Sequence, residues 1–402
     1  MSVALTEQTA VEYILNSPLR ESFFDGDADL NGAAITEGNV NLLFRVSSEA
    51  THKSVLIKQA LPFAWRYPDF KMPVERQKIE NGILEIEGRY CPTQTPKIYL
   101  YDEVNHILVI EYFGDHLVMR EGLMQGNRYP RVAEDLGLFM ARTLFYTSDL
   151  FLSSAEKKAM VPQFINPVLC KVQEDLVFTQ PFIEHPNNRW SKPLSGIVQR
   201  IHADDFLRAE MFLLKERYMT HAQALLHNDL HTGSIMLNQT ETKIVDPEFG
   251  FFGPIGHDIG SYLSNLVLSY AAQEWHRPDE AERAAYREWL LDLIRQTWRI
   301  FEAEWLSLWD NQGIGEWPSE RFRLAYMRQL LQDTAGFGAA EGFRRVIGMA
   351  HVHDFWTIQD ELVRARAESL AINALYGWAL LRRGFTSIED LLDVVKNARP
   401  DL

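Results

Sequence analysis

Ionisable residues are concentrated in one short window in the middle of the chain, between Leu225 and Ser261. Six of them are considered for a site: His227, Asp229, His231, Asp246, Glu248 and Asp258. A tight turn, a short apolar strand, a polar turn and a second strand connect the first loop of this window to the second. A connection of this kind returns its second loop beside its first. We therefore expect Asp229 to lie near Asp246 and Glu248.

Three carboxylates in this arrangement suit phosphoryl transfer. The transferred group is electrophilic, so catalysis depends on orienting the nucleophile and neutralising charge. Asp229 can face a reacting hydroxyl, while Asp246 and Glu248 hold a divalent cation. A single residue separates these last two, so in an extended segment their side chains lie on the same side. Their hard oxygen ligands favour Mg²⁺, with Mn²⁺ as an alternative.

The other residues of the window have structural alternatives. Isolated aspartates in loops often cap helices or form Asx turns, and Asp258 before Ile259-Gly260-Ser261 fits that role. We expect His227 to hydrogen-bond the backbone and hold its loop rather than transfer protons. His231 has the same structural alternative, although its place just past Asp229 keeps it in the site.

The elements that must position this window begin with a helix and a hairpin. Residues Thr6–Asn16 have the spacing of a short amphipathic helix, and Phe24–Gly38 is predicted to be a loop. The segments Asn41–Ser47 and Ser54–Gln59 are short, rich in branched and aromatic residues, and separated by a polar stretch. This pattern predicts a β-hairpin.

The turn Glu37-Gly38-Asn39 precedes the hairpin. Glycine lets the backbone approach phosphates closely, so Gly38 and Asn39 are candidates for nucleotide binding. The alternative is a plain turn, because glycine and asparagine commonly serve turns.

Lys58 ends the second strand of the hairpin, where its ammonium group could point inward at a phosphate. The alternative is a strand-end lysine that extends into water. The next segment, Val74–Tyr90, has helical apolar spacing and carries Glu80, our candidate for the carboxylate that pairs with Lys58. Gly82 inside this segment is unfavourable for a helix.

Two more strands, Lys97–Asp102 and His106–Tyr112, complete a small, mostly antiparallel sheet. Phe113-Gly114-Asp115 follows as a hinge. Backbone amides and carbonyls at the end of such a strand could bind a planar heterocycle, which makes Glu111 and Tyr112 candidates for nucleotide binding. The alternative is a simple strand terminus.

The rest of the chain is mainly helical, interrupted only by short strands at Ile235–Leu237 and Lys243–Val245. Segments with helical spacing are Arg131–Asp149, Ala203–Ala224, Asp258–Gln273, Glu280–Trp309, Glu320–Ala339 and Glu361–Arg383. The fold class is therefore α+β, with a small antiparallel sheet first and helices after it. We expect two lobes, 1–115 covering the nucleotide and 116–402 carrying catalysis and the second substrate.

Composition narrows the class of protein. The 402 residues suffice for two lobes, since single cores rarely exceed roughly 250–300 residues. The formal net charge of −15 argues against a nucleic-acid partner. Two cysteines exclude a disulfide framework, and no secretion signal or long apolar run is present. We expect a soluble, cytoplasmic protein without a membrane partner.

The central motifs resemble a known family. His227-Asn228-Asp229 with Asp246 further on resembles the catalytic loop and metal-binding aspartate of the aminoglycoside phosphotransferase and choline kinase group, which has a bilobal protein-kinase-like fold. The stretches HNDLHTGSIM, DPEFGFFGP, HDIGSYLSNL and RRVIGMAH resemble, more narrowly, the 5-methylthioribose kinases. EGNVNLLFRV resembles their phosphate-covering loop, VLIKQALPFAW their lysine strand, and ARTLFYTSDLF and LCKVQEDLVFTQPF their helical segments.

This resemblance implies ATP as donor and the anomeric hydroxyl of 5-methylthioribose as acceptor, in methionine salvage. It implies that Asp229 orients or deprotonates the sugar hydroxyl and that Lys58 contacts the α/β-phosphates. Arg344 and Arg345 match paired arginines that contact the sugar and the transferring phosphoryl group. Asn41 falls in the phosphate-covering loop and is a further nucleotide-binding candidate. The family also suggests a homodimer.

The chain departs from the wider group at a few positions. Asn228 stands where glycine is more usual, and Ser234 where a metal-binding asparagine is usual, a serine that methylthioribose kinases share. Adjacent arginines on a helix point about 100° apart, so their joint role requires a helix end or a loop. Two other functions remain open at this stage: a kinase for another alcohol, such as choline, homoserine or an aminoglycoside, and a non-catalytic nucleotide-binding protein.

Overall fold

The computed structural model describes residues 3–36, 38 and 40–401. Its N-terminal part is built on a five-stranded antiparallel sheet with the strand order β1-β2-β3-β7-β6. These strands are β1 (Leu30–Ile35), β2 (Leu42–Ser48), β3 (Ser54–Gln59), β6 (Ile98–Asp102) and β7 (Ile107–Glu111). Side chains of β2 alternate between buried and half-buried positions, the period expected for a strand with one face on a core. The predicted hairpin and the two later strands are thus confirmed.

The strand β1 corrects the prediction of a loop over Phe24–Gly38. It pairs with β2 along its whole length, from Leu30↔Ser48 to Ile35↔Leu43. Its sequence, LNGAAI, has a single β-branched residue, Ile35, and no aromatic residue, so it gives only a weak strand signal. The strand lies at the edge of the sheet, where packing by a neighbouring helix replaces propensity.

Three helices accompany this sheet: α1 (Glu7–Leu15), α2 (Leu19–Ser22) and α3 (Arg76–Tyr90). The first begins at Thr6, whose hydroxyl accepts the N–H of Thr9 in a capping box. Ala10 and Ile14 of α1 join a core with strand residues such as Val46 and Ile57. A further hairpin, β4 (Phe63–Ala64) with β5 (Tyr67–Lys71), precedes α3.

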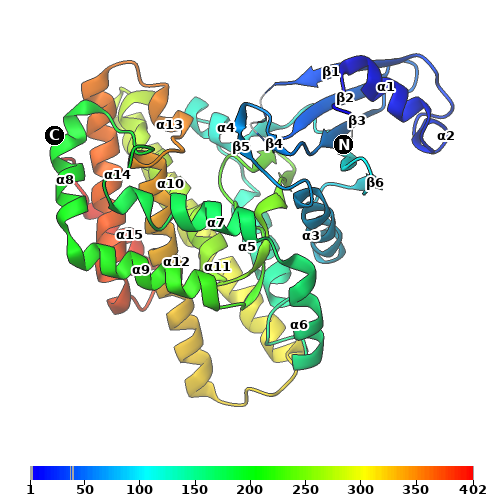
Figure 1. Ribbon diagram of the computed structural model, residues 1–402. Coiled ribbons are helices and arrows are strands. Elements are labelled where there is room, and N and C mark those ends of the chain that lie inside the picture. The colour runs from blue at the N-terminus through cyan, green and yellow to red at the C-terminus, as the bar shows by residue number, and fades with distance from the viewer. Residues whose placement is uncertain (1–2, 37, 39, 402) are drawn as a thin grey trace.

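The remainder is mainly helical, as expected. Its α-helices are α4 (Met119–Gln125), α5 (Val132–Phe145), α6 (Ser154–Met160), α7 (Pro167–Leu176), α8 (Ser195–Ala203), α9 (Asp205–Thr220), α10 (Gly256–His276), α11 (Glu280–Gln312), α12 (Glu320–Ile347), α13 (His353–Trp356), α14 (Glu361–Leu381) and α15 (Ile388–Asn397). Short 3-10 turns are η1 (Val161–Phe164), η2 (Gln180–Phe182), η3 (Lys192–Leu194), η4 (Pro247–Phe249) and η5 (Arg382–Gly384). Figure 1 shows the sheet with α1–α3 on one side of the molecule and α8, α9, α14 and α15 on the opposite side.

The helix α10 is the centre of the helical part. Nearly all its residues are buried, as expected for a helix surrounded by others, and it packs against α12 and α14. The crossing of α10 and α12 is close because glycines meet there. A Cβ at Gly260 would lie 2.3 Å from the Thr334 carbonyl oxygen, and one at Gly338 would lie 2.7 Å from the Gly260 carbonyl oxygen.

Short strands frame the central window. They are β8 (Leu117–Val118), β9 (Ala224–Leu226), β10 (Ile235–Leu237), β11 (Thr242–Ile244) and β12 (Phe251–Gly253). The strand β10 pairs with β11 and with β8, and β9 pairs with β12. These pairings fix both loops of the window against one framework.

Across the described residues, no helix combines the length and apolarity needed to cross a membrane. Both cysteines are free: Cys91 is buried and Cys170 is partly buried.

Candidate active site

The two loops of the central window lie side by side, as predicted. The Val245 N–H donates to the Ser234 carbonyl oxygen at 3.0 Å. From the other direction, Nε2 of His227 lies 2.9 Å from the Val245 carbonyl oxygen. His227 therefore ties one loop to the other, and the structural role expected for it is confirmed.

The first loop contains a residue with a left-handed backbone conformation, which contacts with neighbouring residues hold in place. Asn228 adopts a left-handed conformation with φ of 65°, which explains why glycine suits this position. Its amide donates to the Phe249 carbonyl oxygen at 2.8 Å and to the Tyr218 hydroxyl at 2.9 Å. Asp258 accepts the backbone N–H groups of His227 and Asn228, both at 2.8 Å. Asp258 thus anchors the catalytic loop from the first turn of α10.

Asp229 is held between two cationic or polar partners. Its Oδ1 lies 3.4 Å from Nη2 of Arg345, and its Oδ2 lies 3.4 Å from Nε2 of His231. Burial opposes the negative charge, but His231, Arg345 and Arg344 outweigh it and hold the pKa of this carboxyl well below its usual range. Asp229 is therefore ionised at neutral pH.

The paired arginines lie at the C-terminal end of α12, which runs past its predicted end at Ala339 to Ile347. Both guanidinium groups turn back to Glu341: Arg345 Nε is 2.5 Å from Oε1, and Arg344 Nη1 is 3.1 Å from Oε2. Arg344 also donates to the Gln173 side chain at 2.8 Å, and Gln173 donates to the Asn228 carbonyl oxygen at 3.0 Å. Glu341 is the reason why two adjacent arginines share one direction.

Lys58 joins the sheet to the second loop. Its Nζ lies 2.7 Å from Glu80 and 2.6 Å from Asp246. Glu80 was the predicted partner, and the structure confirms it despite the glycine at position 82. Burial opposes the charge of Lys58, but Asp246, Glu80 and Glu248 outweigh it and raise the pKa of the ammonium group. Burial also disfavours the charge of Glu80 and raises its pKa to about 7, although Lys58 acts to lower this pKa.

The second loop is not the extended segment predicted for it. Asp246 is left-handed, with φ of 67°, and Pro247–Phe249 form a 3-10 turn. The proline fixes its own φ and favours this turn over a strand. The two carboxylates consequently take different partners: Asp246 meets Lys58, whereas Glu248 Oε2 accepts from Arg76 Nε at 3.1 Å and from Asn41 Nδ2 at 2.9 Å.

The predicted nucleotide-binding residues divide into three groups. The side chain of Asn41 is buried and engaged by Glu248 and by Arg76, whose Nη2 donates to it at 2.7 Å. The Gly38 carbonyl accepts from Arg66 at 3.1 Å, and Asn39 lies outside the described residues. Glu111 ends β7 beside Lys243, at 3.6 Å, and Tyr112 follows it into the connection to the helical part.

Sequence reasoning missed Arg76, Glu341 and Arg120. Arg76 is fully buried and binds Glu248, Asn41 and two carbonyl groups. Glu341 precedes the paired arginines by three and four residues, the helical spacing that could have identified it. Arg120 of α4 pairs with Asp354 at 3.1 Å, and no local pattern marks that contact.

The carboxylates fit a hard divalent cation. The side chain of Asp246 is 56% exposed and uses one oxygen on Lys58, which leaves the other available. Glu248 is held in place by Arg76 and Asn41 through one oxygen. No cluster of three His, Cys, Asp or Glu side chains suited to a metal occurs in the described part of the chain. Mg²⁺ commonly takes only one or two carboxylates from a protein, and waters and substrate phosphates complete its coordination.

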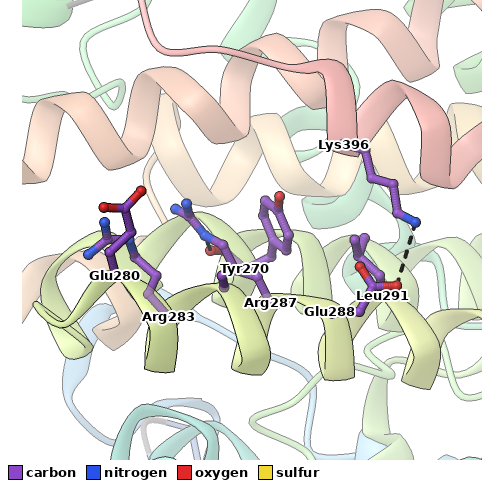
Figure 2. A pocket seen from close by; sticks show the side chains of 8 residues that line it. Tyr270, Glu280, Arg283, Arg287, Glu288, Leu291 and Lys396 are labelled. Carbon is purple, nitrogen blue, oxygen red and sulfur yellow. Dashed lines mark hydrogen bonds and ion pairs between the residues drawn. The ribbon is translucent and has the colours of Figure 1, made fainter.

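Two cavities of about 290 Å³ each lie elsewhere, among α10, α11, α14 and α15. Figure 2 shows one of them, where Lys396 reaches Glu288 at 3.5 Å. Arg283 and Arg287 line both cavities and both pair with Glu274. Internal ion pairs thus satisfy these cations.

Comparisons with known proteins identify the family. The phosphotransferase enzyme family matches residues 74–301. Methylthioribose kinase of Escherichia coli O45:K1 is 37% identical over 377 residues, covering 90% of each chain. Methylthioribose kinase 1 of Oryza sativa subsp. japonica is 37% identical over 405 residues, covering 96% of this chain and 94% of its own. The Geobacillus kaustophilus methylthioribose kinase is 37% identical over 393 residues, covering 96% and 97%.

Among solved structures, a choline kinase from Cryptosporidium parvum aligns over 98% of this chain and 100% of its own, at 15% identity and a TM-score of 0.48. The antiparallel sheet and helical part described above, together with the sequence matches over nearly the whole chain, give the fold class as bilobal and protein-kinase-like. The chain belongs to the phosphotransferase enzyme family and, within it, to the methylthioribose kinases.

Proposed function

We propose that this protein transfers the γ-phosphoryl group of ATP to the C1 hydroxyl of 5-methylthioribose, giving 5-methylthioribose 1-phosphate and ADP in methionine salvage. The observation that carries the proposal is the network around Asp229, an ionised carboxylate fixed beside the paired Arg344 and Arg345. An anionic acceptor group or a transferring phosphoryl group suits these arginines. A cationic acceptor such as choline does not.

On the acceptor side, Asp229 accepts a hydrogen bond from the C1 hydroxyl and directs its oxygen toward the γ-phosphorus. The new O–P bond forms as the bond to the bridging oxygen of ADP breaks. Because its pKa is held low, Asp229 acts mainly by orienting the hydroxyl, and the hydroxyl proton passes to an oxygen of the transferred phosphoryl group. Arg344 and Arg345 offer fork-shaped donors to the sugar and to the phosphoryl oxygens.

On the donor side, Lys58 contacts the α/β-phosphates while Glu80 holds its ammonium group in place. Asp246 and Glu248 are the residues that would hold Mg²⁺, or Mn²⁺ in its place. Such an ion, when bound, neutralises phosphate charge. The turn at Gly38 and Asn39 and the strand end at Glu111 and Tyr112 complete the nucleotide site in this proposal.

The reaction is tested by measuring ADP release with 5-methylthioribose, methylthioadenosine, choline and homoserine in parallel. We expect turnover with 5-methylthioribose and background rates with the others. Turnover confined to another acceptor would overturn the substrate assignment. Absence of turnover with every acceptor, in a protein that binds ATP, would favour a non-catalytic role.

We also propose the lobe division 1–115 and 116–402, a homodimer and a cytoplasmic location. The lobe division is supported by the change from strands to helices after β7. Two free cysteines and the use of ATP suit the cytoplasm. Light scattering of the purified protein measures the dimer, and a monomeric mass at micromolar concentration would contradict it.

A further inference from the structure

Among the six ionisable residues named for the central window, His231 is the one without a task in the proposed function or an explanation in the loop contacts described above. Its side chain is largely buried, with 12% exposed, and lies two residues after Asp229. His227 and Asp258 are already explained by the backbone groups they bind.

The hydrogen bonds of His231 determine where its proton lies. The Gly233 N–H donates to its Nδ1 at 2.8 Å. A nitrogen that accepts a hydrogen bond carries no proton, so the neutral ring must carry its proton on Nε2. This Nε2 lies 3.4 Å from Oδ2 of Asp229. The imidazole therefore presents an N–H group to the catalytic carboxylate.

The ring of His231 packs closely against the backbone of Gly233. A Cβ at Gly233 would lie 2.6 Å from Cε1 of His231 and 2.9 Å from Nη1 of Arg120. Only glycine therefore lets the ring and the guanidinium group pack this closely. Arg120 is itself fixed by Asp354 at 3.1 Å and by Asn265 at 3.1 Å.

The backbone at His231 is fixed as well. Its N–H donates to Oγ of Ser234 at 3.0 Å. The same hydroxyl lies 2.8 Å from the Asp229 carbonyl oxygen and 3.0 Å from that of His231. The serine thus stabilises the loop that sets the distance between the imidazole and the carboxylate.

We propose that His231 is a positioning residue, which donates from Nε2 to Oδ2 of Asp229 while Arg345 holds Oδ1. The carboxylate is then fixed at both oxygens, and its remaining lone pairs have one direction in which to receive the acceptor hydroxyl. This inference rests on the proposed function for its effect on turnover. Its claim about the proton position stands independently of any substrate.

The charge state of the ring agrees with this geometry. Burial lowers the pKa of His231 to about 4 against the opposing effect of Asp229, and the nearby Arg345 and Arg120 lower it further. The ring is thus neutral at physiological pH and acts on Asp229 as a hydrogen-bond donor. The positive charge beside Asp229 comes from the arginines.

The kinetic test compares three variants of the full-length protein. His231→Leu removes the donor and should lower kcat roughly 10- to 100-fold, with the KM for ATP within about twofold of wild type. His231→Gln returns an N–H donor near the position of Nε2 and should recover kcat to within about fivefold of wild type. His353→Gln makes the same exchange at an exposed histidine and should leave both constants unchanged.

Unchanged kcat in His231→Leu would overturn the inference, as would a His231→Gln variant no better than His231→Leu at equal melting temperature. The second arm is ¹⁵N NMR of histidine-labelled protein, with the His231→Gln variant assigning the signal. We expect a protonated Nε2 and a bare Nδ1 between about pH 6 and 8. The opposite tautomer would also overturn the inference. Wild-type protein inactive on 5-methylthioribose but showing the expected tautomer would instead refute the proposed function.

Discussion

The donor side and the acceptor side of this site are built in different ways. On the donor side, Lys58 of the sheet and Arg76 of α3 reach across to Asp246 and Glu248 of the helical part. On the acceptor side, Asp229 and Arg345 both belong to the helical part. The donor charges therefore depend on how the sheet sits on the helices, whereas the acceptor charges are fixed within one packed unit.

The carboxylates of the donor side already have cationic partners from the other part of the molecule. Asp246 and Glu248, the proposed metal ligands, are already paired with protein cations, so a bound metal ion and nucleotide must share or replace these contacts. Asp229 takes its partners, His231 and Arg345, from the helical part itself. We infer that the donor side adjusts on binding and that the acceptor side is pre-organised.

The largest expected effect tests the acceptor side directly. Asp229→Asn keeps the shape of the side chain but removes its charge, and should lower kcat by roughly 10²–10⁴ while leaving ATP affinity largely intact. Steady-state kinetics and a nucleotide-binding titration measure the two quantities. Near-normal turnover would remove Asp229 from its proposed role.

The donor side is tested by Lys58→Met. This change leaves Glu80 buried without a cation, so we expect a loss of roughly 3–5 kcal/mol in the free energy of unfolding and a fall of about 10² in kcat/KM for ATP. Urea unfolding and initial rates measure them. Lys78→Met is the matched control on α3, because its pair with Glu103 is exposed. Equal effects of the two variants would refute the importance of the Lys58 contacts.

A milder change separates charge from geometry on the acceptor side. Arg345→Lys keeps the charge but loses the fork that reaches both Glu341 and Asp229, and should lower kcat roughly 10-fold. Arg328→Lys, at an exposed position of the same helix, should change kcat little. If Arg345→Lys retained the wild-type rate, the contribution of Arg345 to kcat would come from its charge and not from its fork geometry.

The smallest effect concerns pH. The folded protein holds the pKa of His231 at about 4, below the value of about 6.5 for the unfolded chain, so the unfolded state binds the extra proton as pH falls. Stability is therefore undiminished above about pH 6.5 and decreases between there and about pH 4, by about 1 kcal/mol at pH 5.5. His231→Gln should lose this part of the pH dependence in urea titrations. An identical slope in both proteins would contradict the shift.

The parts of the site that follow from residue type and local spacing could be predicted from the sequence. The contacts that depend on tertiary packing could not. Strand and helix periods located the sheet and the long helices, and the central window predicted correctly that its two loops lie together. Glu80 could be predicted because it lies in α3, the first helix after the strand that carries Lys58. Arg76, in contrast, binds Glu248 at a separation of 172 residues, and such a contact leaves no local pattern.

Two expectations failed for physical reasons. The extended geometry of Asp246-Pro247-Glu248 was wrong because proline and a left-handed aspartate make a 3-10 turn. The strand β1 was missed because Ile35 is its only β-branched residue and its pairing with the neighbouring β2 leaves no local signal. The shared direction of the paired arginines came only from family resemblance, and in the structure it follows from their contacts with Glu341 in the preceding turn of α12.

The close crossing of α10 and α12 affects the distance between the loop of Asp229 and Arg345. Asp258, at the start of α10, anchors the catalytic loop, and α12 carries Arg345 at its far end. With a methyl group at Gly260 or Gly338, the two helix axes would have to move apart, and the loop would move relative to the arginine. The spacing between the loop of Asp229 and the side chain of Arg345 thus depends on a point where two helix backbones are in direct contact.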